Sequence, residues 1–227
     1  KKLMENLKFL EEEELIKLKG DKVYLRNTYI AEKLLIDNLR KRLSIDKSKL
    51  NNKEVEIIEN VINNSDIKLN NKQIHSIYES IKNNITIING KAGTGKSTTI
   101  KYIVSAINAI NPKSRIEIIS LSGKAVNVID SKINDSYIEP KTIHRLFNFK
   151  GNNYTTAKKI KKLDYLIIDE MSMLDLKLLS KVLELIPIET KVIFCGDLGQ
   201  IPPIGIGTPV KDILNSKKLK NIELLIN

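Results

Sequence analysis

The chain has 227 residues, enough for one large domain or for a medium-sized domain with a smaller one. Hydrophobic residues make up 41% and charged residues 29%, which excludes a disordered chain, and no apolar run could span a bilayer. The net charge of +11 is typical of a protein that binds a phosphate backbone, although heavy lysine use in an AT-rich genome explains it as well. With a single cysteine, Cys195, and no apolar signal peptide at Lys1–Glu5, we expect a cytoplasmic protein with no membrane partner.

The first 50 residues predict a helix, a hairpin and a second helix. Apolar residues at helical spacing indicate a helix over 3–18, and two short apolar runs flank a Gly20-Asp21 turn. Thr28 can cap a second helix that runs to about Leu43. This order is similar to a winged-helix module, which either binds DNA or packs against protein. We favour the packing role, so this extension is a candidate surface for protein partners.

Residues 51–66 predict a linking helix and a turn, and from Ile67 to Asn227 short apolar runs alternate with helices. Each run is rich in β-branched residues, as strands buried on both faces of a parallel sheet are. The expected strands are 85–89, 116–121, 163–168 and 191–195. The alternation predicts an α/β fold, a parallel sheet flanked by helices.

The segment from Gly90 to Ser97 fits G-x-x-x-x-G-K-[ST] at every fixed position, after a strand and at the start of a helix. Its glycines let backbone N–H groups point at phosphate oxygens, and the helix N-terminus adds positive partial charge. Lys96 is predicted to reach the β- and γ-phosphates of a nucleotide, and the Ser97 hydroxyl to bind Mg²⁺. The expected nucleotide contacts here are Gly90, Ala92, Gly93, Thr94, Gly95, Lys96, Ser97 and Thr98.

Two further strands end in polar side chains at the edge where parallel sheets bind ligands. Asp169 and Glu170 follow an apolar run, and we expect Asp169 to hold Mg²⁺ and Glu170 to orient the attacking water. Gln200, in Gly196–Pro203, is expected near the γ-phosphate, where a neutral amide senses that group without competing with Lys96 for charge. The predicted catalytic residues are therefore Lys96, Asp169, Glu170 and Gln200.

Five segments resemble, in order, the first-half motifs of superfamily 1 helicases of the RecD-like group: Gly90–Ser97, Leu121–Ala125, Thr142–Phe147, Ile168–Met173 and Gly196–Pro203. The strings TIHRLF and GDLGQIPP are the most specific. Val23–Glu32 is more loosely similar to the N-terminal extension of long RecD-like helicases. The resemblance is dense from Ile67 to about Leu214 and implies that this part is the first RecA-like motor domain of a helicase that uses ATP.

The resemblance implies further roles. Gln73 stands where the family reads adenine, and residues 147–157 where relatives insert a hairpin that separates DNA strands. Two short arms around Gly151 favour such a hairpin, with Phe149 and Tyr154 exposed on it to contact DNA. Four residues stand where the family holds the single-strand backbone, and their donors suit phosphate oxygens: Ser122, Lys124, Thr142 and His144.

We therefore expect part of an ATP-dependent DNA helicase that moves 5′ to 3′ and acts on single-stranded DNA and duplex junctions in repair and recombination. In relatives a second RecA-like domain, absent from this chain, supplies arginines that stabilise the transferring phosphoryl group, so we expect the chain alone to bind nucleotide weakly and hydrolyse almost none. Three alternatives stay open: the Pif1-like helicase branch, a P-loop ATPase that does not act on DNA, and a structural subunit.

Overall fold

Six parallel strands form the sheet at the centre of the computed structural model, which describes residues 2–133, 138–151, 154, 156–216 and 221–224. The strands are β3 (Ile85–Gly90), β4 (Ile116–Ser120), β5 (Lys141–Thr142), β6 (Tyr165–Ile168), β7 (Lys191–Gly196) and β8 (Asn221–Leu224). Their order across the sheet is β5-β4-β6-β7-β3-β8, and every neighbouring pair is parallel. The predicted α/β fold is confirmed.

The four predicted strands lie within two residues of their expected limits. The edge strands β5 and β8 were not predicted, because runs of two and four residues show too little alternation to be recognised. Both pair at the outside of the sheet, β5 with β4 and β8 with β3.

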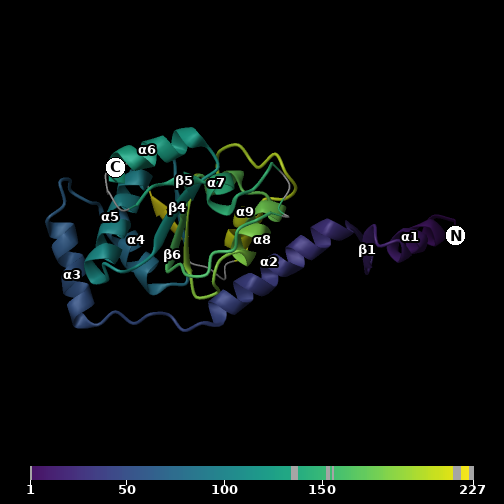
Figure 1. The fold of residues 1–227 in the computed structure, drawn as a ribbon, viewed down its shortest axis with the longest axis horizontal. Helices are drawn as coiled ribbons and strands as arrows, with labels where there is room; N and C mark the ends of the chain where they lie inside the picture. The colour runs from purple at the N-terminus through teal and green to yellow at the C-terminus, as the bar shows by residue number, and fades with distance from the viewer. Residues whose placement is uncertain (1, 134–137, 152–153, 155, 217–220, 225–227) are drawn as a thin grey trace.

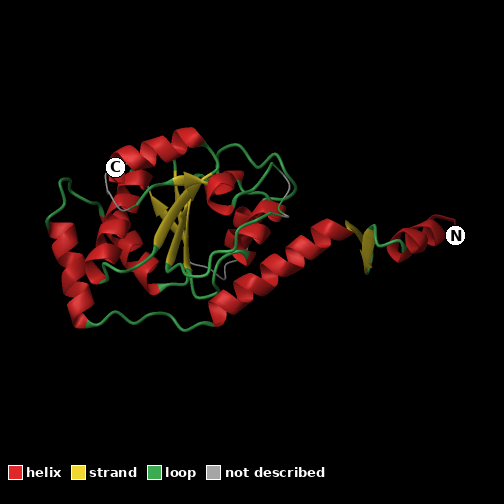
Figure 2. Ribbon diagram, in the orientation of Figure 1, coloured by secondary structure: helices red, strands yellow, loops and turns green. Residues whose placement is uncertain are grey.

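Successive residues of the inner strands face opposite sides of the sheet, as the period of a strand requires. Ile87 and Ile88 are both fully buried, yet they belong to separate apolar clusters on the two faces. One face is covered by α7 (Ile143–Phe147), α8 (Leu176–Glu184) and α9 (Pro209–Asn215). The other is covered by α4 (Asn71–Lys82), α5 (Lys96–Ile110) and α6 (Gly123–Ile133), with α3 (Asn52–Asn63) packed on α5 (Figure 2).

The N-terminal residues form an arm that projects from this body (Figure 1). It consists of α1 (Lys2–Glu12), β1 (Ile16–Lys19), β2 (Lys22–Leu25) and α2 (Arg26–Ser44). The arm has a helix, a hairpin and a second helix in this order, but the first helix ends at Glu12 and not at residue 18 as predicted. The reason is that Ile16–Lys19 pair with β2 as an antiparallel strand.

One buried arginine ties the arm to the body, because the base of α2 packs along α8. Arg42 is fully buried and donates hydrogen bonds to the carbonyl oxygens of Leu183 (3.3 Å), Ile188 (3.1 Å) and Thr190 (2.7 Å). It also donates to the side-chain oxygen of Asn38 at 2.8 Å. Burial lowers the pKa of Arg42 to about 10, so the guanidinium group stays charged at neutral pH.

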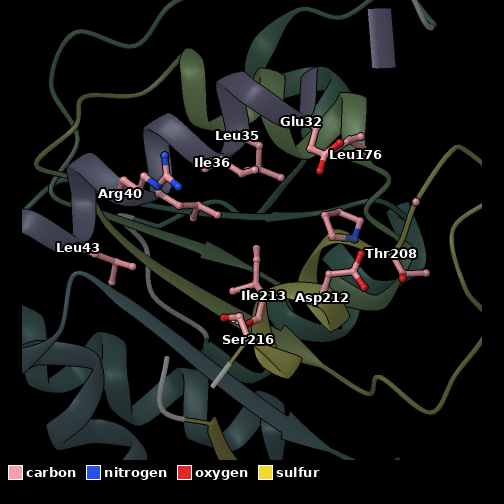
Figure 3. Close-up of a pocket in the computed structure, with 13 residues that line it drawn as sticks. Glu32, Leu35, Ile36, Arg40, Leu43, Leu176, Thr208, Asp212, Ile213 and Ser216 are labelled. Carbon is pink, nitrogen blue, oxygen red and sulfur yellow. Dashed lines mark hydrogen bonds between the residues drawn. The ribbon is translucent and has the colours of Figure 1, made fainter. Parts of the chain in front are cut away.

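A cavity of about 530 Å³ lies between α2 and α9, along residues 32–43 of α2. Leu35 and Ile36 of α2 face Ile213 of α9 across it, with Arg40 and Asp212 also in its lining (Figure 3). Of the residues that line it, none belongs to the predicted nucleotide, Mg²⁺ or DNA sites. No helix within the described part of the chain has the length and apolar character to cross a membrane.

Candidate functional site

Three adjacent strands bring the predicted catalytic segments together. β6, β7 and β3 are neighbours in the sheet, and all three run in the same direction. Asp169 and Glu170 follow β6, Gly196–Pro203 begins at the end of β7, and the phosphate loop, residues 90–97, begins at the end of β3. These segments therefore meet at the carboxyl edge of the sheet, where ligands of such folds bind.

The phosphate loop curls through two left-handed glycines. Gly93 and Gly95 have φ angles of 82° and 83°, a conformation that disfavours side chains. Gly95 directly precedes the 15-residue helix α5, whose first N–H groups have no partner within the helix. A Cβ atom at Gly95 would lie 2.5 Å from Nε2 of Gln73, so the loop also rests closely against α4.

The amino group of Lys96 lies inside the curve of the loop. Its Nζ donates to the carbonyl oxygens of Gly90 at 2.7 Å and of Lys91 at 2.9 Å. The Thr94 hydroxyl donates to the same Lys91 oxygen at 2.9 Å. Because these acceptors are neutral, a negatively charged phosphate oxygen can replace them and form a stronger bond to the ammonium group.

Asp169 is buried at the end of β6, only 8% exposed. The pKa of its carboxyl group is raised to about 6, mainly by burial and also by the Glu170 charge, while a hydrogen bond from the Glu170 backbone and the charges of Lys96 and Lys132 oppose the rise. Glu170 has a φ angle of 56°, uncommon for a residue with a side chain, and precedes the short helix η1 (Met171–Met173). The chain therefore turns at Glu170, directly after the end of β6.

Gln200 lies in a loop that is attached to the strand before the phosphate loop. The backbone N–H of Leu198 donates to Oδ1 of Asn89 at 3.0 Å. The Gln200 side chain is exposed and lines a cavity of about 270 Å³ together with Met171 and Ser172. The structure therefore places Gln200 beside η1, directly after the two carboxylates. Asn89 is a positioning residue that sequence reasoning missed.

The far end of the Gln200 loop packs on the N-terminus of α8. A Cβ at Gly205 would lie 2.1 Å from an Asp175 carboxylate oxygen, a separation only glycine permits. Asp175 caps α8 by accepting from the N–H of Leu178 at 2.8 Å, and the N–H of Leu176 donates to the Ile206 carbonyl oxygen at 3.0 Å. The loop is therefore held at both ends.

Gln73 lies in the first turn of α4, against the phosphate loop. Its Oε1 accepts from the Asn70 N–H at 2.9 Å, and the Asn70 side chain accepts from the Gln73 N–H at 3.0 Å, which is a capping box. Gln73 is buried and its amide nitrogen faces Gly95. The cap fixes the side chain beside the predicted nucleotide contacts.

The residues expected to hold single-stranded DNA lie at or just after the ends of β4 and β5. In the sheet, β6 separates these two strands from β7 and β3, which lead into the Gln200 loop and the phosphate loop. The hydroxyl oxygens of Ser122 and Thr142 accept from the N–H groups of Ala125 (3.1 Å) and Arg145 (3.2 Å), at the starts of α6 and α7. Each hydroxyl keeps its own O–H as a donor. Lys124 is exposed and His144 is partly exposed. These four residues lie along the same sheet edge as the nucleotide residues.

The expectation that Phe149 is exposed on a hairpin is wrong. Phe149 is 7% exposed, stacks on Phe147 with ring centroids 5.5 Å apart, and meets the edge of Tyr154 at 4.7 Å. Asn148 has a φ angle of 56°, so the chain turns back after α7 and carries Phe149 into the core. Tyr154 is also partly buried, and burial raises its pKa. Residues 152, 153 and 155 of the predicted hairpin lie outside the described residues.

The residues present fit a nucleotide that brings Mg²⁺ with it. Among the described residues, no three His, Cys, Asp or Glu side chains cluster as a complete metal site. Ser97, at the start of α5, and the buried Asp169, after β6, offer one hydroxyl and one carboxylate oxygen donor at this edge. Mg²⁺ in nucleotide sites is bound by one or two carboxylates, phosphates and water, so a sparse donor set is what the chemistry needs.

Comparison with known proteins agrees with this geometry. The profile of the AAA domain family matches residues 73–206. An uncharacterised protein of Methanocaldococcus jannaschii, MJ1519, is 36% identical over 117 residues, 45% of this chain and 10% of that protein. The RecBCD enzyme subunit RecD of Buchnera aphidicola is 31% identical over 116 residues, 44% of this chain and 19% of that protein.

The Pif1 helicase of Candida albicans has a similar structure, with a TM-score of 0.50 and 23% identity over 70% of this chain and 40% of that one. That likeness shows the fold, a RecA-like sheet with flanking helices. This chain spans a tenth to a fifth of the two curated relatives. The family match and the RecD relative confirm the resemblance that the motifs predicted.

Proposed function

We propose, from the premise that this chain belongs to the AAA domain family, that it is the ATP-hydrolysing motor part of a RecD-like DNA helicase. One observation carries the proposal. Lys96, Asp169, Glu170 and the Gln200 loop meet on three adjacent strands, and the next two strands bring Ser122 and Thr142 to the same edge. Nucleotide chemistry and contacts to a nucleic-acid backbone therefore share one rigid sheet.

Each residue of the proposed nucleotide site has a role that its position in the structure supports. Lys96 exchanges the Gly90 and Lys91 carbonyls for oxygens of the β- and γ-phosphates, and the N–H groups that open α5 donate to the same phosphates. Ser97 and Asp169 would hold Mg²⁺, which would neutralise charge on the phosphates. Glu170 orients the attacking water.

Gln200 reports the γ-phosphate to the rest of the sheet edge. Its loop is bonded to Asn89, one residue before the phosphate loop, and rests on Asp175 beyond η1. A change at the γ-phosphate therefore reaches both the β3 and the β6 ends. For such a change to drive movement, ATP must bind one conformation of the motor better than the other.

The proposed DNA contacts lie farther along the same edge of the sheet, at the ends of β4 and β5. Ser122, Lys124, Thr142 and His144 donate to phosphate oxygens of single-stranded DNA, which carry little sequence information. Gln73 recognises adenine from the start of α4. Translocation runs 5′ to 3′ in DNA repair and recombination, as the resemblance to RecD-like helicases implies, and the N-terminal arm is a surface for protein partners. A Pif1-like helicase is the second candidate, supported by the fold likeness.

The test is steady-state ATP hydrolysis by the full-length protein, with and without single-stranded DNA. We expect strong stimulation by DNA, abolished by Lys96→Ala and retained by Lys113→Ala, an exposed lysine beyond α5. This chain alone should bind nucleotide weakly and hydrolyse almost none. Turnover that is indifferent to DNA would return the protein to the P-loop ATPases that do not act on DNA.

A further inference from the structure

The basic charge of the chain is concentrated in one segment. Residues 140–163 contain seven Lys or Arg residues and no Asp or Glu, whereas the other 203 residues contain 31 basic and 27 acidic residues. Lysine use that followed genome composition alone would spread through the chain. The excess instead lies in α7 and in the connection that leads from it to β6.

Most of these charges are free to meet a partner. Lys141 pairs with Glu117 at 3.3 Å and Arg145 with Glu139 at 3.1 Å. The remaining five are exposed, and none has an ion pair with any residue that the structure describes: Lys150, Lys158, Lys159, Lys161 and Lys162. The acidic residue that follows, Asp164, already accepts from the N–H of Arg115 at 2.7 Å.

Four of the lysines stand on a backbone that is held in place. The N–H of Lys158 donates to the Phe147 carbonyl oxygen and the N–H of Ile160 to the Leu185 carbonyl oxygen, both at 2.8 Å. Ile160 packs against the core, and the lysines on either side of it are exposed. We call Lys158, Lys159, Lys161 and Lys162 the lysine strip. It leads from α7, at the carboxyl edge, to the beginning of β6 at the opposite edge.

The segment offers no surface for stacking bases. Phe147 and Phe149 are buried, and Tyr154 packs against Phe149, so no described aromatic side chain of residues 140–163 is exposed. Proteins that bind single strands combine basic grooves with aromatic side chains on which bases stack. A strip of lysines alone suits a partner whose bases are hidden and whose phosphates are densely spaced, which is duplex DNA.

We propose that the lysine strip binds the phosphate backbone of double-stranded DNA, separately from the single strand held at the carboxyl edge. This proposal rests on the proposed function and adds a second DNA contact to it. The strip starts beside α7, which carries His144, so the two contacts adjoin where a duplex would open into a single strand. Lysines act here as point charges that set position without reading sequence.

The test compares binding of a blunt duplex and of a single strand of equal length to the full-length protein, by fluorescence anisotropy without nucleotide. One variant replaces all four lysines of the strip with Gln. A charge-matched control replaces four exposed lysines elsewhere with Gln: Lys49, Lys53, Lys68 and Lys113. A third variant replaces the strip lysines with Arg, which keeps the charge, and circular dichroism checks that each variant is folded.

For the duplex, we expect the slope of log affinity against log salt concentration to become shallower by about 3 to 4 in the Gln variant. The reason is that each lost phosphate contact contributes about 0.9 to this slope. Between 50 and 200 mM salt the wild type then loses on the order of 100-fold more duplex affinity than the variant. The control set and the Arg variant should keep the wild-type slope, and single-strand affinity should change little.

Three results would contradict the proposal that the lysine strip binds duplex DNA. They are no duplex binding by the wild type, an equal change of slope in the control set, or a parallel loss of single-strand binding in the Gln variant. ATP hydrolysis measured with and without single-stranded DNA distinguishes a failure of the lysine-strip proposal from a failure of the proposed function. If stimulation persists while the duplex result is negative, only the strip is wrong. If the wild type shows no stimulation, the proposed function fails whatever the duplex result.

Discussion

Asn89 accepts a hydrogen bond from the backbone N–H of Leu198 at 3.0 Å, across 109 residues of sequence. The bond joins the end of β3 to the loop after β7, so the phosphate loop and Gln200 share a fixed reference point. Both strands are interior members of the sheet, and their register is set by pairing along five residues. The amide of Asn89 adds the one side-chain link between their two loops that the described residues provide.

Asn89→Leu should uncouple the Gln200 loop from the phosphate loop. The change removes the acceptor and leaves the part-buried Leu198 N–H without a partner, which costs about 1 to 3 kcal/mol. We expect kcat for DNA-stimulated ATP hydrolysis to fall roughly tenfold, equivalent to about 1.4 kcal/mol, while nucleotide affinity changes little. Asn89→Asp keeps an acceptor oxygen and should restore the stability of the protein in urea. Equal stability losses in both variants would contradict the role of the bond.

Local pattern was enough to predict the phosphate loop, the carboxylates and four of six strands. The glycine spacing of 90–97 encodes a turn before a helix, and β-branched runs are typical of buried parallel strands. Asn89 and Arg42 could not be found this way, because their partners are distant in sequence, up to 148 residues for Arg42. The prediction that Phe149 is exposed failed for a related reason, because the direction of its side chain depends on the left-handed turn at Asn148.

Gly95→Ala should act partly through Gln73. The φ angle of 83° costs an L-residue roughly 1 to 2 kcal/mol, and the new Cβ would lie 2.5 Å from Nε2 of Gln73. Urea denaturation of Gly95→Ala, Gln73→Ala and the double variant separates the two effects. We expect the double variant to be more stable than the sum of the single losses predicts, by about 0.5 to 1 kcal/mol. Strict additivity would mean that the two side chains do not touch.

Arg42→Ala should loosen the N-terminal arm. The substitution leaves the carbonyl oxygens of Ile188 and Thr190 without this donor and removes a buried charge that they stabilise. We expect a loss of about 3 kcal/mol in the free energy of unfolding, and faster proteolytic cleavage of α2. Arg42→Lys should recover only part of this loss, because an ammonium group lacks the planar set of donors. Arg40→Ala, at an exposed position in the same helix, serves as the control and should change stability little.

Asp169→Asn should stabilise the protein at neutral pH while it abolishes hydrolysis. Burial raises the pKa of Asp169 from 3.8 to about 6, so the folded chain without nucleotide disfavours the charged form that Mg²⁺ binding needs. Below about pH 4 the carboxyl group is protonated in both folded and unfolded states and has no differential effect. Stability is lost as pH rises from about 4 to 6, because only the unfolded state then ionises freely. The advantage of Asn over Asp should therefore grow by about 2 kcal/mol between pH 4.5 and 7.5, measured in urea.

Asp66→Asn provides a control of opposite sign. The hydrogen bond from Lys101 lowers the pKa of the Asp66 carboxyl group, so its charged form stabilises the folded state. The Asn variant should lose that stabilisation at neutral pH, and the loss should disappear as pH falls below about 4, where the wild-type group also becomes protonated. A stability difference for Asp169→Asn that stays constant with pH would mean that Asp169 titrates normally, and one that follows the direction of Asp66→Asn would mean that its pKa is lowered; either result would contradict the prediction.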